Sequence, residues 1–302
     1  MTDQFCSTLS MQAGESLFAS APQAEVFFLL EYNGAWGVKA FEESGIPTAV
    51  KEALSAAAHD LPTAKILLIK RSLVARQGRL TFFVVLASEQ NPALYEFHLD
   101  DYEDLLAIDL AAAIRRDPGY QDMLASGPLF LVCTNGRRDA CCARYGVPLD
   151  QAMQQSAAGA VWECSHVGGH RFAANVYQMP DGLLYGRLRP QDSSSLAAAA
   201  QEKRLLLDHL RGRSAYAPVL QAAEYYYRLQ TGQSALNAFH LESAEQVESG
   251  RWEIVLRSTQ DNAQHRLQIA VEKTETLIYE SCSLEKQTRL TRHHLVGLDR
   301  PL

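Results

Sequence analysis

Hydrophobic and polar positions along the chain alternate in short blocks that predict a mixed α/β fold. Before residue 120, four apolar runs have the length and the β-branched or aromatic composition of buried strands. We predict these strands at residues 25–32, 64–70, 80–87 and 94–99. Helical spacing occupies residues 47–59 and 102–115, and Asp117-Pro118-Gly119 marks a boundary after them.

The same order of elements recurs after this boundary. Apolar runs predict strands at residues 129–133, 161–164, 172–178 and 183–188. A helix at residues 139–157, interrupted near Gly146 and Pro148, follows the first of these strands, and a helix at residues 193–210 follows the last. Each half therefore has the order strand, helix, three strands and helix. A parallel crossover followed by a hairpin and a helix is the arrangement of a thioredoxin-like unit.

The two halves also align at their first turns. Glu31-Tyr32-Asn33-Gly34 matches Cys133-Thr134-Asn135-Gly136, so Glu31 stands where Cys133 does. One interpretation is a duplication in which the first unit has an empty site. The other is chance similarity between two α/β units.

A different pattern follows Gly212. Residues 217–229 predict a tyrosine-bearing helix, and alternating positions then predict an antiparallel meander. Its strands are expected at residues 239–247, 252–257, 265–271 and 276–279. His293-His294 are expected in a solvated tail, and this part carries no expected chemistry. We predict an α/β protein with two thioredoxin-like units, at residues 1–120 and 121–212, and a C-terminal α+β antiparallel extension at residues 213–302.

Composition narrows the class of protein. The 302 residues are 47% hydrophobic and 21% charged, with a net charge of −7, which argues against nucleic acid as a main partner. No apolar run approaches the ~20 residues needed to cross a bilayer, so no membrane segment is expected. The first ten residues lack a signal-peptide pattern, and we expect a cytoplasmic protein. Six cysteines are too few for a disulfide scaffold, and their clustering indicates metal binding or redox chemistry.

Four soft or borderline metal ligands fall in two short loops. Cys133 ends a predicted strand, and Cys142 lies near the start of a helix that Asp139 can cap. His166 and His170 follow another strand, and the two glycines between them indicate a loop rather than a helix. Two loops with two ligands each predict a four-ligand metal site.

Several kinds of site compete for these residues. Structural zinc with two Cys and two His is one, although eight residues separate Cys133 from Cys142 and zinc fingers place two to four there. A thiol-disulfide oxidoreductase would use a Cys-x-x-Cys pair, which is absent, and adjacent Cys141-Cys142 make a poor redox pair. Buried core cysteines with unrelated histidines are the remaining alternative.

A [2Fe–2S] cluster fits the two pairs better. Such a cluster can be held by two Cys on one iron and two His on the other. Cys164-Ser165-His166 imitates the first half of a Rieske motif, but nothing downstream supplies the second half. We therefore reject the Rieske fold and keep the Rieske-like ligation.

The chain resembles the sucrase/ferredoxin-like family over roughly residues 6 to 190. Two motifs and a softer N-terminal segment carry the resemblance. The matching residues are Cys133, Arg138-Asp139, Cys142, His166, Gly168-Gly169-His170, Ala174-Asn175, and, near the start, Cys6-Ser7, Gly14-Glu15, Glu31, Gly34 and Trp36-Gly37. The C-terminal meander is not covered.

The resemblance implies a thioredoxin-like [2Fe–2S] ferredoxin domain at residues 121–212. Its ligands would be Cys133, Cys142, His166 and His170, as in the family's Cys₂His₂ members. The protein would be an electron carrier rather than an enzyme with its own substrate site. Its partner would be a redox protein, either a reductase or an acceptor, and the sequence leaves both this partner and the oligomeric state open.

Residues around the expected ligands have supporting roles in this interpretation. Arg138 could offset the charge of the cluster, or form a surface ion pair. Asn175 could fix a ligand loop, or simply end a strand. Gly168 and Gly169 are expected to let backbone N–H groups approach the cluster sulfurs. Two further residues, Cys141 and Cys164, are possible substitute ligands, but burial as small apolar side chains is the favoured interpretation.

Overall fold

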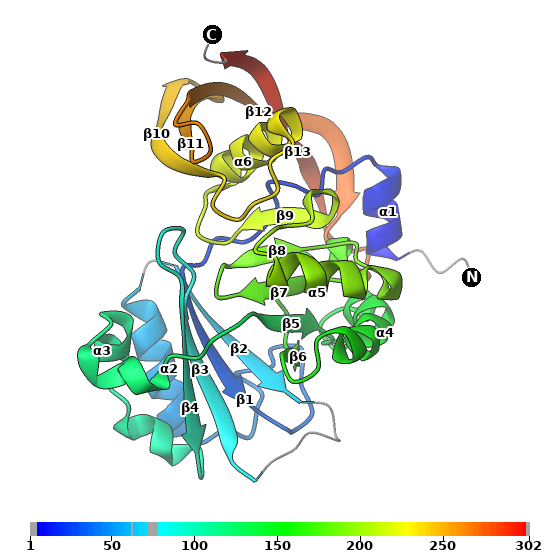
Figure 1. Ribbon diagram of the computed structural model, residues 1–302. Helices are drawn as coiled ribbons and strands as arrows, with labels where there is room; N and C mark the ends of the chain where they lie inside the picture. The colour runs from blue at the N-terminus through cyan, green and yellow to red at the C-terminus, as the bar shows by residue number, and fades with distance from the viewer. Residues whose placement is uncertain (1–4, 62, 72–77, 300–302) are drawn as a thin grey trace.

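Two β-sheets organise the chain in this computed structural model, which describes residues 5–61, 63–71 and 78–299 (Figure 1). Within those ranges the larger sheet is mixed and has nine strands, and the smaller is antiparallel and has four. The predicted α/β fold with a C-terminal antiparallel part is therefore confirmed. The two predicted α/β units, however, form a single continuous sheet.

The first part of the larger sheet is built from a parallel pair and a hairpin. Its elements are β1 (Val26–Glu31), α2 (Thr48–His59), β2 (Ala64–Lys70), β3 (Leu80–Leu86) and β4 (Ala93–Leu99), followed by η2 (Glu103–Ala107), α3 (Leu110–Ile114) and η3 (Pro118–Met123). β1 and β2 are parallel across α2, whereas β3 is antiparallel to β1 and β4 to β3. All of β1 is buried, because apolar clusters cover both of its faces.

The second part repeats this topology. Its elements are β5 (Leu129–Cys133), α4 (Ala140–Ser156), β6 (Val161–Cys164), η4 (His170–Phe172), β7 (Val176–Met179), β8 (Leu183–Tyr185), η5 (Pro190–Asp192), α5 (Ser193–Gln201), η6 (Leu207–His209) and β9 (Leu210–Arg213). β5 and β6 are parallel across α4, β7 is antiparallel to β5, and β8 is antiparallel to β7. The predicted order of strands and helices is confirmed in both parts.

Strands β2 and β6 join the two parts. They pair antiparallel at their C-terminal ends, through Ile69 with Cys164 and Lys70 with Glu163. The strand order is therefore β4-β3-β1-β2-β6-β5-β7-β8-β9. Loops that follow β1 and β5 meet at this seam, where Asn135 Nδ2 donates to the Gly37 carbonyl at 3.1 Å. The division of the chain at residues 120 and 212 stays a prediction.

Some element boundaries differ from the sequence prediction. Helix α4 runs through Gly146 and Pro148 without the predicted interruption. Gly146 lets the helix lie directly against the Cys133 carbonyl, because a Cβ there would overlap the carbonyl oxygen. The helix predicted at residues 193–210 ends at Gln201, before Lys203 adopts a left-handed backbone with φ of 52°.

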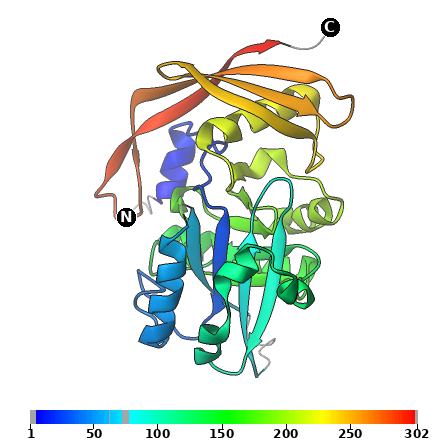
Figure 2. The ribbon, with the colours of Figure 1, turned by 90° about the vertical axis from the view of Figure 1, so that its left-hand side faces the viewer.

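The C-terminal sheet lies against helix α6 (Pro218–Thr231) (Figures 1 and 2). Its strands are β10 (Phe239–Glu248), β11 (Arg251–Ser258), β12 (Gln264–Tyr279) and β13 (Gln287–Asp299). The predicted meander is confirmed, but the two strands expected at residues 265–271 and 276–279 are the single strand β12. His293-His294 lie in β13, so the expected solvated tail is wrong.

Helix α1 (Cys6–Gln12), which the sequence pattern did not predict, lies far from the N-terminal α/β unit. It packs against η4 and β12, and Figure 2 shows the long β12–β13 hairpin descending beside it. The first and last parts of the chain therefore meet at the second unit. Across the described ranges, none of the helices combines the length and apolar composition required to span a bilayer.

A buried ionic network fastens α6 to the larger sheet. The Glu224 carboxylate, on α6, accepts from Arg213 of β9 at 3.0 Å and from Arg228 of α6 at 2.9 Å. All three side chains are at most 5% exposed. Such groups tolerate burial only because each charge is compensated.

Glu224→Ala should therefore lower the free energy of unfolding by about 3–5 kcal/mol, because it leaves two guanidinium groups buried without their carboxylate. Urea denaturation measures the change. Glu248→Ala is the control, since Glu248 forms an ion pair with Arg251 in which both side chains are about 60% exposed, and it should cost less than about 1 kcal/mol. Equal losses of unfolding free energy in the two variants would show that the buried ionic network does not stabilise the fold more than a surface ion pair does.

Candidate metal centre

Three of the four expected ligands lie together at the carboxyl ends of β5 and β6. Cys133 ends β5, Cys142 lies in the first turn of α4, and His166 follows β6. His166 Nδ1 lies 3.6 Å from Cys142 Sγ and 4.0 Å from Cys133 Sγ. One ligand atom from each residue falls within 4.8 Å of the other two. Parallel strands joined by a crossover bring these loops to one edge of the sheet.

The two thiols share their protons unequally. Both cysteines are at most 1% exposed. The pKa of Cys133 lies well below its usual value, because the Cys142 thiol donates to it and His166 and the Val167 N–H also stabilise the thiolate. The pKa of Cys142 is raised by the same hydrogen bond and by burial. A thiolate held beside a thiol and an imidazole is a suitable donor set for a soft metal ion.

His170 lies beside this group, in η4. Its ring centroid is 5.1 Å from that of His166. The His170 Nε2–H donates to the carbonyl of Glu280, and the Asp139 carboxylate is 3.7 Å from the same nitrogen. In a neutral imidazole the other nitrogen, Nδ1, then carries the lone pair. Among the described residues this buried Nδ1 has no hydrogen-bond partner.

Burial keeps His170 neutral. Its side chain is 12% exposed. Burial lowers the pKa of His170, and the neighbouring His166 acts in the same direction, although Asp139 opposes both. A neutral ring with a free, buried Nδ1 and a hydrogen-bonded Nε2–H is the state in which histidine binds a metal.

The expected loop-fixing role of Asn175 agrees with its contacts. The Asn175 side chain donates to the Gly169 carbonyl at 3.1 Å and accepts from Arg211 at 2.9 Å. Arg211, which the sequence analysis missed, also donates to the Gly168 carbonyl at 2.9 Å. The two side chains therefore hold in place the loop between His166 and His170, which we call the histidine loop. Arg211 lies in β9, a strand that the sequence pattern did not predict, so the sequence carries no signal of this role.

Gly168 and Gly169 have left-handed backbones, with φ of 98° and 68°. A side chain on Gly169 would overlap the Arg211 guanidinium, and a Cβ on Gly168 would lie 2.8 Å from Pro22. The glycines therefore let the loop approach its supports. Their expected approach to cluster sulfurs stays a prediction, and the amide that donates to a ligand sulfur is that of Val167.

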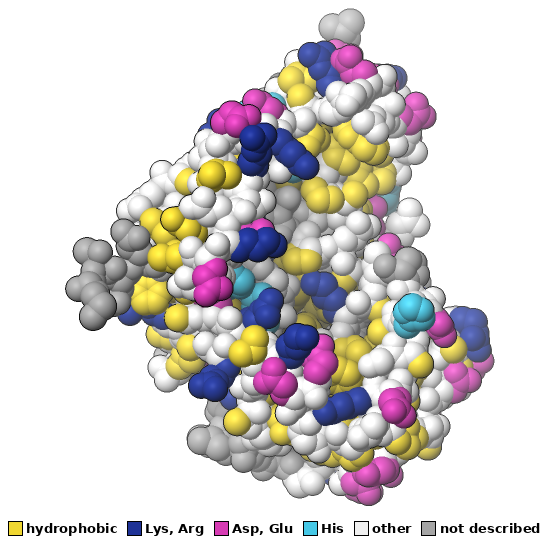
Figure 3. Space-filling model, turned by 180° about the vertical axis from the view of Figure 1, so that it is seen from behind, with side chains coloured by type: hydrophobic (Ala, Val, Ile, Leu, Met, Phe, Trp, Pro, Cys, Tyr) yellow, Lys and Arg dark blue, Asp and Glu magenta, His cyan; other side chains and the backbone are white. Residues whose placement is uncertain are grey.

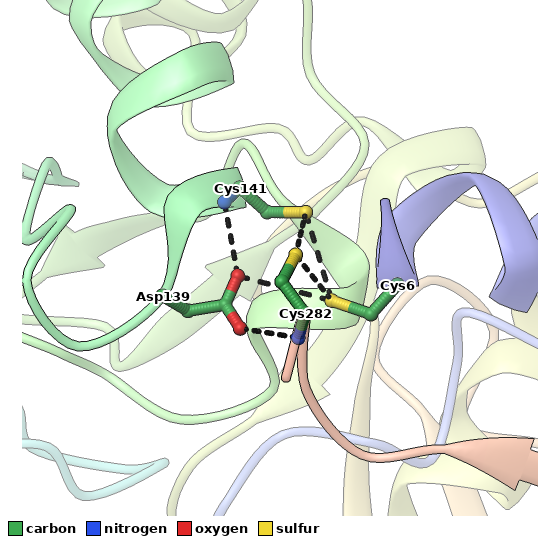
Figure 4. Close-up of side chains that lie close together, drawn as sticks. All are labelled: Cys6, Asp139, Cys141 and Cys282. Carbon is green, nitrogen blue, oxygen red and sulfur yellow. Dashed lines mark hydrogen bonds between the residues drawn. The ribbon is translucent and has the colours of Figure 1, made fainter. Parts of the chain in front are cut away.

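A second group of thiols lies beside Asp139 (Figure 4). It contains Cys6 of α1, Cys141 of α4 and Cys282 of the loop between β12 and β13. Their sulfurs are 3.2–3.6 Å apart. From its sequence context Cys141 was expected to be a small buried residue, and no chemistry was expected near Cys282. Cys164, the other possible substitute ligand, belongs to neither group of the described residues.

Hydrogen bonds fix the protonation pattern in this second group. The Cys6 thiol donates to Cys141, which lowers the pKa of Cys141 to about 6 and raises that of Cys6. Burial raises the pKa of Cys282 to about 12. The buried Asp139 carboxylate accepts the backbone N–H of Cys141 at 2.9 Å and that of Cys282 at 2.8 Å. Burial alone would raise the pKa of Asp139, but these bonds hold it below its usual value.

A groove of about 850 Å³ opens beside His166. Its charged lining is mainly basic, with Glu42 as the only carboxylate among the described lining residues. The basic side chains are Lys39, Lys51, Lys65 and Arg138. Figure 3 shows a face of the molecule where Lys and Arg side chains (dark blue) gather around His side chains (cyan). The exposed Arg138 therefore contributes charge beside the expected ligands, although its contact with a cluster stays a prediction.

The fold and the thiol–imidazole site define a class of α/β proteins with a candidate metal centre at the strand ends. Residues 17–212 match the sucrase/ferredoxin-like family, and the chain belongs to that family. The match includes all four expected ligands and Cys141, but neither Cys6 nor Cys282.

A curated relative matches part of the chain. Altered inheritance of mitochondria protein 32 of Meyerozyma guilliermondii is 26% identical over an alignment of 138 positions that covers 42% of this chain. The aligned segment spans 47% of that relative, about half of its length. No solved structure matches the chain.

Gly169→Ala should lower the free energy of unfolding by about 3 kcal/mol, because it combines left-handed strain with overlap against Arg211. Gly159→Ala is the matched control: Gly159 is also left-handed, with φ of 84°, but a Cβ there meets open space, so only the strain of about 1–2 kcal/mol applies. Denaturant titration of both variants measures the difference. Similar losses of unfolding free energy in the two variants would show that a methyl group at position 169 does not clash with Arg211.

Lys65→Met should stabilise the protein at neutral pH. Burial, together with Arg211, lowers the pKa of Lys65 to about 8 from 10.5. Between pH 8 and 10.5 the folded state thus binds fewer protons than the unfolded state. Below pH 8 Lys65 is protonated in both states, and the folded state carries an unfavourable buried charge. Removing this charge should raise the free energy of unfolding by up to about 3 kcal/mol at pH 7. The gain should shrink as the pH rises above 8 and vanish near 10.5.

Denaturant titrations at pH 7, 8.5 and 9.5 test this dependence. Lys39→Met, which changes an exposed lysine of the same groove, is the control and should show little change at any pH. A gain for Lys65→Met that is constant across the three pH values would contradict the lowered pKa.

Proposed function

We propose that the protein is a one-electron carrier that holds a [2Fe–2S] cluster through Cys133, Cys142, His166 and His170. The two cysteines would bind one iron and the two histidines the other. The observation that carries the proposal is the buried Nδ1 of His170. It has a lone pair and no partner among the described residues, and it lies beside a thiolate, a thiol and a second imidazole.

The surroundings support this ligand set. The Glu280 carbonyl holds the proton of His170 on Nε2, away from the metal-binding nitrogen. The Val167 N–H stabilises the Cys133 thiolate. When bound, a cluster with two neutral imidazoles would accept one electron at ~ −150 to +300 mV, compared with ~ −400 mV for ligation by four thiolates.

The repeated topology supports a thioredoxin-like origin for both parts of the larger sheet. Each has a parallel crossover, then an antiparallel hairpin, in the same strand order. In the first part Glu31 occupies the position of Cys133, and its carboxylate accepts from the Thr81 N–H at 2.9 Å. The loop equivalent to the histidine loop includes residues 72–77, which lie outside the described residues. We propose a duplication in which only the second unit binds a cluster.

The basic groove is the surface that a redox partner would contact. It reaches His166 and carries four basic side chains in a chain with a net charge of −7. Complementary charge accelerates association and orients the partner. The donor or acceptor would therefore be a protein with an acidic surface. The thiols of Cys133 and Cys142 must stay reduced to bind metal, and the cytoplasm is a compartment that keeps thiols reduced.

A structural zinc site is the second candidate. The distances of 3.6 and 4.0 Å from His166 Nδ1 to the two sulfurs are short enough for three ligands to meet at one ion. Metal analysis separates this alternative from the cluster.

Protein purified without oxygen should contain about two iron and two sulfide per chain, with the visible absorption of a [2Fe–2S] centre. Cys133→Ala and Cys142→Ala should lose both iron and colour, since each removes a thiolate ligand. Cys164→Ala is the control: Cys164 is equally buried but outside the ligand group, so its variant should keep the cluster. A colourless wild type with zinc bound by Cys133 and Cys142 would refute the cluster and support the second candidate.

A further inference from the structure

The second thiol group has the geometry of a metal site in its own right. We propose that Cys6, Cys141, Cys282 and Asp139 bind one zinc ion, independently of the centre at Cys133 and Cys142. The four residues come from three distant parts of the chain, and their ligand atoms all lie within 4.8 Å of one another.

The distances approach those of a single tetrahedral ion. The three sulfur–sulfur separations are 3.2, 3.5 and 3.6 Å. Zinc–sulfur bonds of about 2.3 Å in a tetrahedron place the sulfurs about 3.8 Å apart. Asp139 Oδ1 is 3.8 Å from Cys6 Sγ, and a zinc–oxygen bond of about 2.0 Å would give about 3.5 Å. Small outward shifts of the sulfurs would therefore admit the ion.

The carboxylate favours zinc over copper(I). Both ions bind thiolates, but a hard carboxylate oxygen suits zinc, which is usually bound by four ligands in structural sites. Copper(I) would use the three sulfurs without Asp139. Asp139 is placed as a ligand by its own bonds, because the N–H groups of Cys141 and Cys282 orient its two oxygens.

Local polar groups would stabilise the negative charge of the ligands. Cys141 lies in the first turn of the 17-residue helix α4, whose N-terminus favours anions. The Ser7 hydroxyl lies 3.3 Å from Cys141 Sγ, close enough to donate to it. Such bonds to coordinating sulfurs are typical of metal sites.

Zinc at this position would fasten three elements and position a ligand of the first site. It would connect α1, α4 and the β12–β13 loop. That loop also supplies the Glu280 carbonyl, two residues before Cys282, which accepts the His170 Nε2–H. Loss of zinc should therefore loosen the support of His170 without removing any iron ligand.

Metal analysis of the full chain, purified without oxygen from zinc-supplemented cells, tests the proposal. Wild type should contain about one zinc per chain. Cys6→Ser and Cys282→Ser should each lower the zinc content at least about tenfold while the iron stays bound. Cys164→Ser, a buried cysteine outside both groups, is the matched control and should keep zinc. Cys133→Ala should lose iron but keep zinc.

X-ray absorption at the zinc edge of the wild type provides a test that needs no variant to fold. We expect three sulfurs at about 2.3 Å and one oxygen at about 2.0 Å. Two sulfurs and two nitrogens would instead place zinc at Cys133 and Cys142, which refutes both this inference and the [2Fe–2S] proposal. Wild type that contains iron but no zinc, holds copper instead, or has a disulfide among Cys6, Cys141 and Cys282 would refute this inference alone.

Discussion

The carboxylate of Asp139 is the group on which both thiol clusters depend. It caps α4 and so fixes the helix turn that carries Cys141 and Cys142, which belong to different ligand groups. Its other oxygen accepts the N–H of Cys282 and lies near His170. One buried side chain therefore sets the direction of a helix, holds a loop from the C-terminal sheet and adjoins a histidine ring.

The sequence was most informative where structure is local. Strands such as β2, β5 and β6 were predicted to the residue, because their apolar runs are bounded by polar or turn residues. The Asp139 cap and the two ligand loops were also evident, since each depends on residues fewer than ten positions apart. The meeting of Cys133, Cys142 and His166 then follows from one parallel crossover.

The remaining contacts could not be read from local patterns. Cys6 and Cys282 are in contact although 276 positions separate them, and no periodicity records such a pair. The Glu280 carbonyl beside His170 is a backbone group and has no signature of its own. β9 was hidden by alanine-rich helical spacing before it, and β12 was divided because the mid-strand charges resemble a turn. In each case tertiary packing decided the outcome.

The hydrogen bond from His170 to Glu280 also has a consequence for the order in which the protein matures. A chain synthesised from its N-terminus exposes Cys133, Cys142, His166 and His170 long before residues 280–282 leave the ribosome. Until then His170 lacks the acceptor that fixes its tautomer, and Cys6 and Cys141 lack their third thiol. The polar contacts of His170 and of the second thiol group are therefore complete only after the final hairpin has docked.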